Sequence, residues 1–267
     1  MPSLSHFNYH KLDALPLCLG ALKHPPRDLY YTGRLERLNA PLKVAIVGSR
    51  SPSQYTQHSS AMLAKAIAKL GGVVVSGGAL GVDIIAQKNA LPHTIMIAPC
   101  SLDRIYPPTN APTICKIAQE GLILSEYARN FLPYRHSFLE RNRLIIALSD
   151  LVIIPEANLH SGSMASAKLA LAYQKPLFVL PHRLGESLGT QALLQTNKAQ
   201  AIYDLERFCA QLAHDHHLNP STPQDALLEF FKSAPTYEQA YARYGDLLVE
   251  YELQGLIMRH NGCVVLA

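Results

Sequence analysis

Cations and aromatic rings alternate within one short stretch of the chain, residues 129–143. The stretch carries Arg129, Phe131, Tyr134, Arg135, Phe138, Arg141 and Arg143. Proteins that bind single strands of nucleic acid combine cations, which contact phosphates, with rings on which bases stack. We therefore predict that a polynucleotide contacts Arg135, Phe138, Arg141, Asn142 and Arg143. An alternative stays open, in which Arg141 and Arg143 bridge to a neighbouring sheet and Phe131 packs in the core.

Three other segments combine glycine with serine directly after an apolar run that is typical of a buried strand. They are Gly48-Ser49-Arg50, Ser76-Gly77-Gly78 and Ser161-Gly162-Ser163. Glycine allows a ligand to approach the backbone, free amides at a helix start bind phosphate, and arginine holds phosphate by two parallel hydrogen bonds. Ligands of open α/β sheets bind beyond the carboxyl ends of the strands, so one extended anion would touch all three segments. Ordinary tight turns, helix capping by the serines and an ion pair of Arg50 remain alternatives.

Other kinds of site receive little support. The turn at residues 76–78 matches neither the G-x-G-x-x-G nor the G-x-x-x-x-G-K-[ST] pattern of nucleotide loops. The five cysteines lie far apart without a C-x-x-C pair, which favours reduced thiols over a zinc site or disulfides. Three histidines lie close together at positions 214, 216 and 217, but a solvated linker explains them better than a metal. We expect no metal, no cofactor and no catalytic residue.

From residue 43 onward, short apolar runs alternate with longer segments of helical periodicity. Strands are predicted near residues 44–47, 73–75, 94–97, 122–124, 151–154 and 177–180. Helices are predicted near residues 54–70, 82–90, 113–119, 138–148, 163–174 and 189–196. This alternation predicts an α/β fold with a Rossmann-like, doubly wound and mostly parallel sheet.

The chain divides into four parts by composition. Residues 1–40 contain paired prolines and only a weak helical start, so they are interpreted as an N-terminal extension packed on the main domain, residues 41–213. Residues 214–223 are polar, carry two prolines and are typical of a linker. Within residues 224–267, helical patterns near 224–233, 237–241 and 245–253 precede a hairpin signal at Asn261-Gly262. These patterns predict a small C-terminal winged-helix-like domain.

The net charge of +4 is unevenly distributed. Residues 221–267 hold three basic and six acidic side chains, whereas the rest of the chain holds 21 basic and 14 acidic ones. A polyanion should therefore bind the first part and avoid the last. No apolar run approaches the roughly 18 residues that a membrane span requires. The first residues lack the pattern of a secretory signal, so we expect a cytoplasmic protein without membrane contact.

Several segments together resemble the DNA-processing protein A (DprA/Smf) family. They are VAIVGSR (44–50), VVSGGALGVDIIAQ (74–87), Ile105-Tyr106-Pro107 with Asn110, ILSEY (123–127), RNRLIIALSD (141–150) and Glu156-Ala157 with Ser161-Gly162-Ser163. Their order and spacing over residues 43–203 carry the resemblance. It implies a Rossmann-like fold, a homodimer, binding of single-stranded DNA during natural transformation, and delivery of that DNA to the RecA recombinase. It also implies a loading protein rather than an enzyme.

The resemblance carries over to individual residues. Residues 48–50 match the family's phosphate contact, and residues 76–78 match its second glycine turn. Arg135 and Phe138 match the basic and base-stacking positions. The glycine-rich turn that usually follows the sixth strand reads Pro181-His182-Arg183 here, a departure from the pattern. The acidic last helix of the tail, with Glu250 and Glu252, favours contact with protein over insertion into a DNA groove.

Two other functions remain open. A phosphoribohydrolase-like enzyme that processes nucleotides would use a related Rossmann-like fold, with Glu156 as the acid. Such enzymes usually carry a tighter glycine-glycine-x-glycine-threonine turn, which this chain lacks. A structural adaptor would act through the acidic tail alone.

Overall fold

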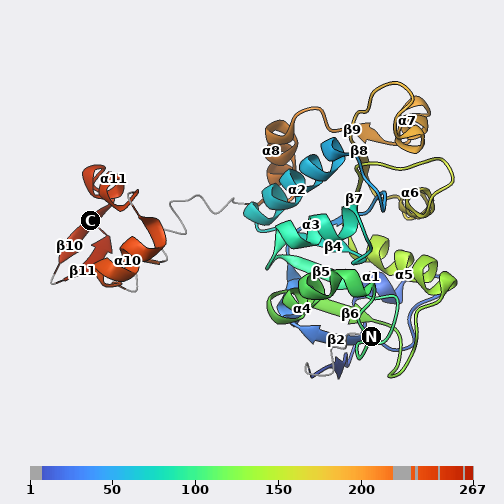
Figure 1. Ribbon diagram of the computed structural model, residues 1–267, viewed down its shortest axis with the longest axis horizontal. Helices are drawn as coiled ribbons and strands as arrows, with labels where there is room; N and C mark the ends of the chain where they lie inside the picture. Colours follow the sequence, from blue (N-terminus) through green and yellow to red (C-terminus); the bar gives the residue numbers. More distant parts are fainter. Residues whose placement is uncertain (1–7, 219–229, 232–233, 246, 261, 267) are drawn as a thin grey trace. The chain divides into compact units, whose positions relative to one another are not determined.

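The computed structural model describes residues 8–218, 230–231, 234–245, 247–260 and 262–266. These residues belong to two compact units, which divide after Leu218. The larger unit holds one sheet with helices on both faces, and the smaller unit holds short helices and a hairpin (Figure 1).

One nine-stranded sheet runs through the larger unit in the order β1-β2-β6-β5-β4-β3-β7-β8-β9. Its seven parallel strands are β3 (Lys43–Ile46), β4 (Val73–Ser76), β5 (Thr94–Ile97), β6 (Leu122–Ser125), β7 (Leu151–Ile154), β8 (Leu177–Val179) and β9 (Gln200–Ala201). The six predicted strands therefore all form. The order reverses at β3, which pairs with β4 on one side and with β7 on the other.

Alternate residues of each strand pack on opposite faces of the sheet. Val44 and Ile46 belong to the apolar cluster under one helical layer, whereas Ala45 and Val47 belong to the cluster under the other. A strand with both faces covered must be apolar throughout, because neighbouring side chains point in opposite directions. This requirement is the reason that short continuous apolar runs predicted the strands correctly.

Four helices cover each face of the sheet. One face carries α2 (Gln54–Lys69), α3 (Val82–Ala90), α4 (Ala111–Glu120) and α8 (Leu205–Asp215). The other face carries α1 (Leu17–Gly20), α5 (Arg135–Leu148), α6 (Gly162–Ala172) and α7 (Leu188–Gln195). Two 3₁₀ turns, Leu35–Asn39 and Pro108–Asn110, lie in connections. The arrangement is the predicted doubly wound α/β fold.

The N-terminal segment is interpreted from its sequence as an extension packed on the main domain, but it contributes two strands to the sheet. These strands are β1 (His10–Lys11) and β2 (Tyr30–Gly33), and β2 pairs antiparallel with β6, so this segment extends the sheet. The predicted linker start is also too early, because His214 lies in the last turn of α8. Leu212 of this helix is buried under the sheet, so the polar residues that suggested a linker end a packed helix.

The smaller unit contains α10 (Tyr237–Tyr244), α11 (Leu247–Leu253) and a hairpin of β10 (Ile257–His260) and β11 (Cys263–Leu266). Its core is formed by Phe231, Ala240, Leu248, Ile257 and Val264. A small domain of helices and a sheet was predicted here, and it is present. The predicted helix near 224–233 and Asn261 of the hairpin turn lie largely outside the described residues. Within the described part of the chain, none of the helices has the length and hydropathy needed to cross a bilayer.

Candidate nucleic-acid interface

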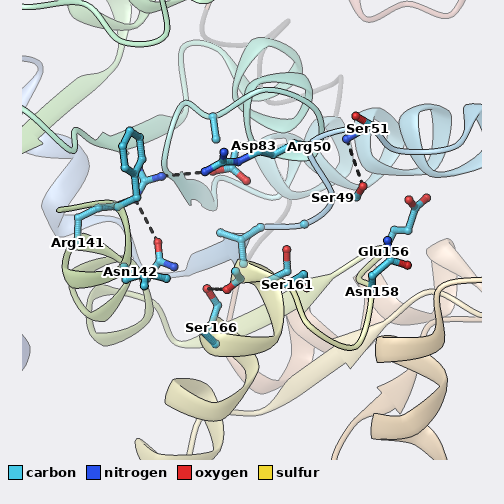
Figure 2. Close-up of a pocket in the computed structure, with 18 of the residues that line it drawn as sticks. Ser49, Arg50, Ser51, Asp83, Arg141, Asn142, Glu156, Asn158, Ser161 and Ser166 are labelled. Carbon is cyan, nitrogen blue, oxygen red and sulfur yellow. Dashed lines mark hydrogen bonds and ion pairs between the residues drawn. The ribbon is translucent and has the colours of Figure 1, made fainter. Parts of the chain in front are cut away.

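A cleft of about 890 Å³ opens at the carboxyl edge of the sheet, where the strand order reverses (Figure 2). The loops after β3 and β7 diverge there, which is the place where open α/β sheets bind ligands. The cleft is lined by residues from five regions, namely the β3–α2 loop, the start of α3 with the residues before it, the connection after β5, the first half of α5, and the β7–α6 loop with the start of α6. The sheet topology thus brings the first and last glycine-serine segments together, as the sequence predicted.

The loop after β3 is held in place from two sides. The Ser49 amide donates to the Glu156 carbonyl at 2.9 Å, and the Ser49 carbonyl accepts from the Val82 amide at 3.1 Å. Gly48 lies directly against the side chain of Val82, where a Cβ atom would collide with it. Only glycine allows this close approach of strand and helix. The rigid loop presents Arg50, which is exposed, to the cleft.

Glu156 is tied to the start of α2. Its Oε2 accepts from the Ser53 amide at 2.9 Å, and the hydroxyls of Ser49, Ser53 and Thr56 also bond to it. Burial alone would raise the pKa of Glu156, but these hydrogen bonds hold it below its ordinary value. The carboxylate is therefore ionised at neutral pH and serves to hold the loop. An acid catalyst needs the opposite shift.

The N-terminus of α6 forms the opposite wall of the cleft. Ser161 caps the helix, since its Oγ accepts from the Met164 amide at 3.3 Å. Gly162, the first helical residue, is exposed, while Ser163 is mostly buried. The first amides of a helix have no partner within it and carry the positive end of its dipole. Ser161, Gly162 and Ser163 all line the cleft, which gives it a place for an anion.

Aromatic side chains stand on the α5 side. The rings of Phe138 and Tyr106 meet edge to face with centroids 5.3 Å apart, and the guanidinium carbon of Arg50 lies 5.8 Å from the Phe138 centroid. A second, smaller cavity of about 50 Å³ lies beside this group and is lined in part by Leu80 and Pro107. Arg135, the first residue of α5, is exposed and lines the main cleft. Cation and ring are thus combined at one rim.

The glycine turn after β4 requires a correction. We expected an anion at Ser76, Gly77 and Gly78, but the turn binds groups of the protein itself. The Gly77 amide donates to Asp83 Oδ2 at 3.1 Å, and the Gly78 carbonyl accepts from Asn110 at 2.9 Å. Ser76 is fully buried and its hydroxyl donates to the Ile46 carbonyl at 2.6 Å. These residues are buried and shape the wall, and the Ser76 hydroxyl and the Gly77 amide already donate to groups of the protein.

Asp83 occupies the place that an external anion would take. Besides Gly77, the amides of Gly48 and Ala79 hydrogen bond to its carboxylate, and Arg141 Nη2 lies 3.9 Å from Oδ2. Burial raises the pKa of Asp83, and the charge of Arg141 and the three amides oppose that shift. The sequence offered only its position in the first turn of α3 as a signal, which helix-dipole complementarity explains equally well.

Two of the predicted contact arginines also have partners within the protein. Arg141 is 4% exposed and its Nη1 donates to the carbonyls of Gly77 and Ile97. Arg143 forms two bonds with Glu126, at 3.2 and 2.5 Å. Both arginines therefore bridge to the sheet side, as the alternative interpretation expected, and Arg141 also lines the cleft.

Asn142 lies between these two arginines in the sequence and lines the cleft. Its Oδ1 accepts from Arg141 Nε at 3.1 Å, so the buried arginine orients the amide. Phe131 does not face the cleft, because its ring stacks on Tyr127 with centroids 4.0 Å apart. In the part of the chain that the structure describes, no cluster of His, Cys, Asp and Glu is suited to a metal ion.

Comparison with known proteins gives consistent matches. The model of the family described as DNA recombination-mediator protein A matches residues 6–213. Protein Smf of Synechocystis is 36% identical over 205 residues, which cover 74% of this chain and 51% of that protein. DprA of Bacillus subtilis is 32% identical over 202 residues, covering 74% and 68%. The chain spans about half the length of the Synechocystis relative.

Solved structures agree with these matches. DNA processing protein A from Helicobacter pylori, described for its single-stranded-DNA-binding mode, is 57% identical, with a TM-score of 0.78. That match covers 79% of this chain and 98% of the other. DprA from Streptococcus pneumoniae is 31% identical, with a TM-score of 0.70 and coverage of 77% and 74%. By sequence, fold and extent of match, the chain belongs to the DNA recombination-mediator protein A family, as the DprA/Smf resemblance predicted.

Proposed function

We propose that this chain binds single-stranded DNA in the cleft at the carboxyl edge of the sheet. The observation that carries the proposal is the cleft itself, in which exposed Arg50 and Arg135 and the ring of Phe138 face the start of α6. Cations, an accessible ring and free helix amides are the groups that bind a phosphodiester chain and its bases. The Helicobacter pylori relative, 57% identical, is described as binding single-stranded DNA, which supports the assignment.

Each wall of the cleft binds a different part of the DNA chain. Arg50, Arg135 and the first amides of α6 hold phosphates, and the start of α6 adds the hydroxyl of Ser161. Ser49 lines the cleft, but its amide and hydroxyl are bonded to Glu156. Phe138, supported edge-on by Tyr106, stacks on a base. A base is bound by stacking on its face and not by hydrogen bonds to its edge, so the preference for particular sequences is low. Ser76, Gly77, Gly78, Arg141 and Arg143 keep the walls in place from behind.

We infer the cellular role of the protein from the family to which it belongs. We assign to this chain the protection of DNA that enters during natural transformation, as a homodimer in the cytoplasm, and the loading of the RecA recombinase onto it. A recombination mediator must hold a single strand without sequence preference and then release it to another protein. Binding through phosphates and stacking meets the first requirement.

An enzymatic role has weaker support. The acid of a phosphoribohydrolase-like reaction would be Glu156, whose pKa is lowered by its hydrogen bonds to the α2 start. Such a group remains ionised at neutral pH and cannot donate a proton to a leaving base. A panel of nucleotides assayed for base release provides the check, and turnover that disappears in Glu156→Ala would favour the enzyme.

The proposal is tested by titrating labelled single-stranded and duplex DNA with the protein at several salt concentrations. We expect tighter binding to the single strand, and a log–log salt slope of about 0.7 per phosphate contact. Arg50→Ala should weaken binding and lower the slope by about 0.7. Lys69→Ala is the matched control, because it removes an exposed charge at the far end of α2. A preference for duplex, or an affinity independent of salt, would contradict the proposal.

Phe138→Ala separates stacking from charge. Loss of the ring should weaken binding by about 1–3 kcal/mol, while the salt slope stays the same because stacking releases no counterions. Phe138→Tyr keeps a ring and should bind like the parent. If Arg50→Ala and Phe138→Ala both leave the affinity unchanged, DNA does not bind in this cleft.

A further inference from the structure

A second combination of rings and a cation lies next to the cleft, at the segments that follow β3 and β8. Tyr55 is in the first turn of α2, and His182 follows β8. Their rings meet at 89° with centroids 5.5 Å apart, and Tyr55 is 48% exposed. Strands β3, β7 and β8 are neighbours in the sheet, so the segments that follow their carboxyl ends lie side by side. Arg183, next to His182, is exposed as well.

Hydrogen bonds hold this group in position. His182 Nε2 lies 2.8 Å from the Pro155 carbonyl, so this nitrogen is the donor, and Pro155 directly precedes Glu156 of the cleft. The Arg183 carbonyl accepts from Gln191 at 2.6 Å. Further along the same loop, the hydroxyl of Ser187 accepts from the Ala157 amide at 3.0 Å. The loop after β8 is therefore tied to the loop that forms the cleft wall.

The carboxylate of Glu156 lines the cleft and is bonded to the start of α2, the helix that carries Tyr55. Its oxygens already accept hydrogen bonds from the Ser53 amide and the hydroxyls of Ser49, Ser53 and Thr56, which partly screen its negative charge. Charge-assisted hydrogen bonds of this kind disperse the negative charge over the start of α2. A polyanion that leaves the cleft on the side of Tyr55 therefore passes a carboxylate whose charge is partly screened.

We propose that the DNA strand leaves the cleft past Glu156 and stacks a further base on Tyr55, with Arg183 holding the adjoining phosphate. Tyr55, His182 and Arg183 form what we call the exit platform. The inference rests on the proposed function and adds the direction of the strand and a second stacking position. His182 supports the Tyr55 ring edge-on, as Tyr106 supports Phe138. The turn that departs from the family's glycine-rich pattern thus gains a role.

The test measures affinity against the length of a single strand, using oligothymidylates from about 4 to about 16 nucleotides. The shortest strands occupy the cleft alone, so Tyr55→Ala should bind them like the parent. On the longer strands this variant should bind about 5-fold to 100-fold more weakly. Arg183→Ala should lower the salt slope by about 0.7 on long strands only.

Two control variants accompany the test. Tyr55→Phe keeps the ring and removes the hydroxyl, so it should bind strands of every length like the parent. Tyr241→Ala removes a tyrosine of similar exposure, 47%, from the small C-terminal unit and should leave binding unchanged. Circular dichroism of each variant verifies that the fold is retained.

The outcomes separate this inference from the proposed function. If Tyr55→Ala binds strands of every length like the parent while Arg50→Ala binds them weakly, the exit platform is refuted and the cleft stands. If Tyr55→Ala weakens short and long strands equally, Tyr55 belongs to the cleft and the proposed path is wrong. If Arg50→Ala and Phe138→Ala also bind like the parent, the proposed function fails and the platform with it.

Discussion

The carboxylate of Asp83 binds three backbone amides that surround the turns after β3 and β4. In many α/β proteins such amides hold a phosphate of the ligand. Here they hold a side chain, which in turn pairs with Arg141. The contacts to an external phosphate are therefore left to exposed groups such as Arg50 and Arg135.

Arg141→Met provides a test of this buried pair. The change leaves Asp83 as a buried charge with a lost partner, so the free energy of unfolding should fall by about 3–5 kcal/mol. Urea unfolding followed by circular dichroism measures it. Arg135→Met is the control, because this arginine is exposed and its loss should change stability by less than about 0.5 kcal/mol. Equal midpoints for the two variants and the parent would show that the pair is not structural.

The lowered pKa of Glu156 predicts how the stability of the protein changes with pH. Its folded-state pKa lies below the ordinary value of 4.5, so its contribution to stability is present above pH 4.5 and is lost as the pH falls through the folded-state value. Glu156→Gln should therefore be less stable than the parent at pH 7, and the difference should shrink as the pH falls below 4.5 and through the folded-state pKa. Urea midpoints at pH 7 and pH 3.5 check this. A difference that grows in acid would mean that the carboxyl is protonated in the native protein at neutral pH.

Helices α5 and α6 form the two opposite rims of the cleft. Helix α5 brings Arg135 and Phe138 to one rim, while α6 directs its N-terminus at the other. The residue before α6, Ser161, has an extended backbone with φ −118° and ψ 161°. A proline at the next position is compatible with that conformation.

Gly162→Pro uses this compatibility to remove one amide and keep the helix. Proline is well tolerated at the first helical position, and a Cβ atom at Gly162 meets nothing within 4 Å. If the first amide of α6 binds a phosphate, this variant should bind single-stranded DNA about 5-fold to 10-fold more weakly. Gly162→Ala retains the amide and should bind like the parent. Equal affinities for all three proteins would remove the helix start from the DNA contact.

Charge is divided between the two units of the molecule. Residues 219–267 contain the three basic and six acidic side chains of the C-terminal region, so residues 1–218 carry a net charge of +7. The cleft is built entirely within the larger unit. The acidic unit thus reduces the attraction of the whole chain for a polyanion without lining the cleft.

Deletion of residues 219–267 should therefore retain DNA binding. At low salt the shortened protein should bind single strands at least as tightly as the full chain, and the difference should disappear as salt screens the charges. Affinity measured at two salt concentrations, with circular dichroism to verify the fold, provides the check. Loss of binding by a folded fragment would place the DNA site in the C-terminal unit.

The sequence by itself determined six of the seven parallel strands and most of the helices that cover them, because burial on both faces and helical periodicity are local patterns. It also identified Arg50, Arg135, Phe138 and Ser161 as lining residues, since each follows a strand or begins a helix at the carboxyl edge. Strands β1, β2 and β9 escaped prediction, because they are short and are defined by their pairing with neighbouring strands.

Only the tertiary structure decided which charged side chains are available to a ligand. Arg141 and Arg143 have the same residue type as Arg135, but their carboxylate partners, Asp83 and Glu126, come from other parts of the chain. An ion pair between distant residues leaves no periodic signal, so sequence cannot separate a buried arginine from an exposed one. The physical reason is that desolvation and pairing depend on the packed neighbours, which the fold alone brings together.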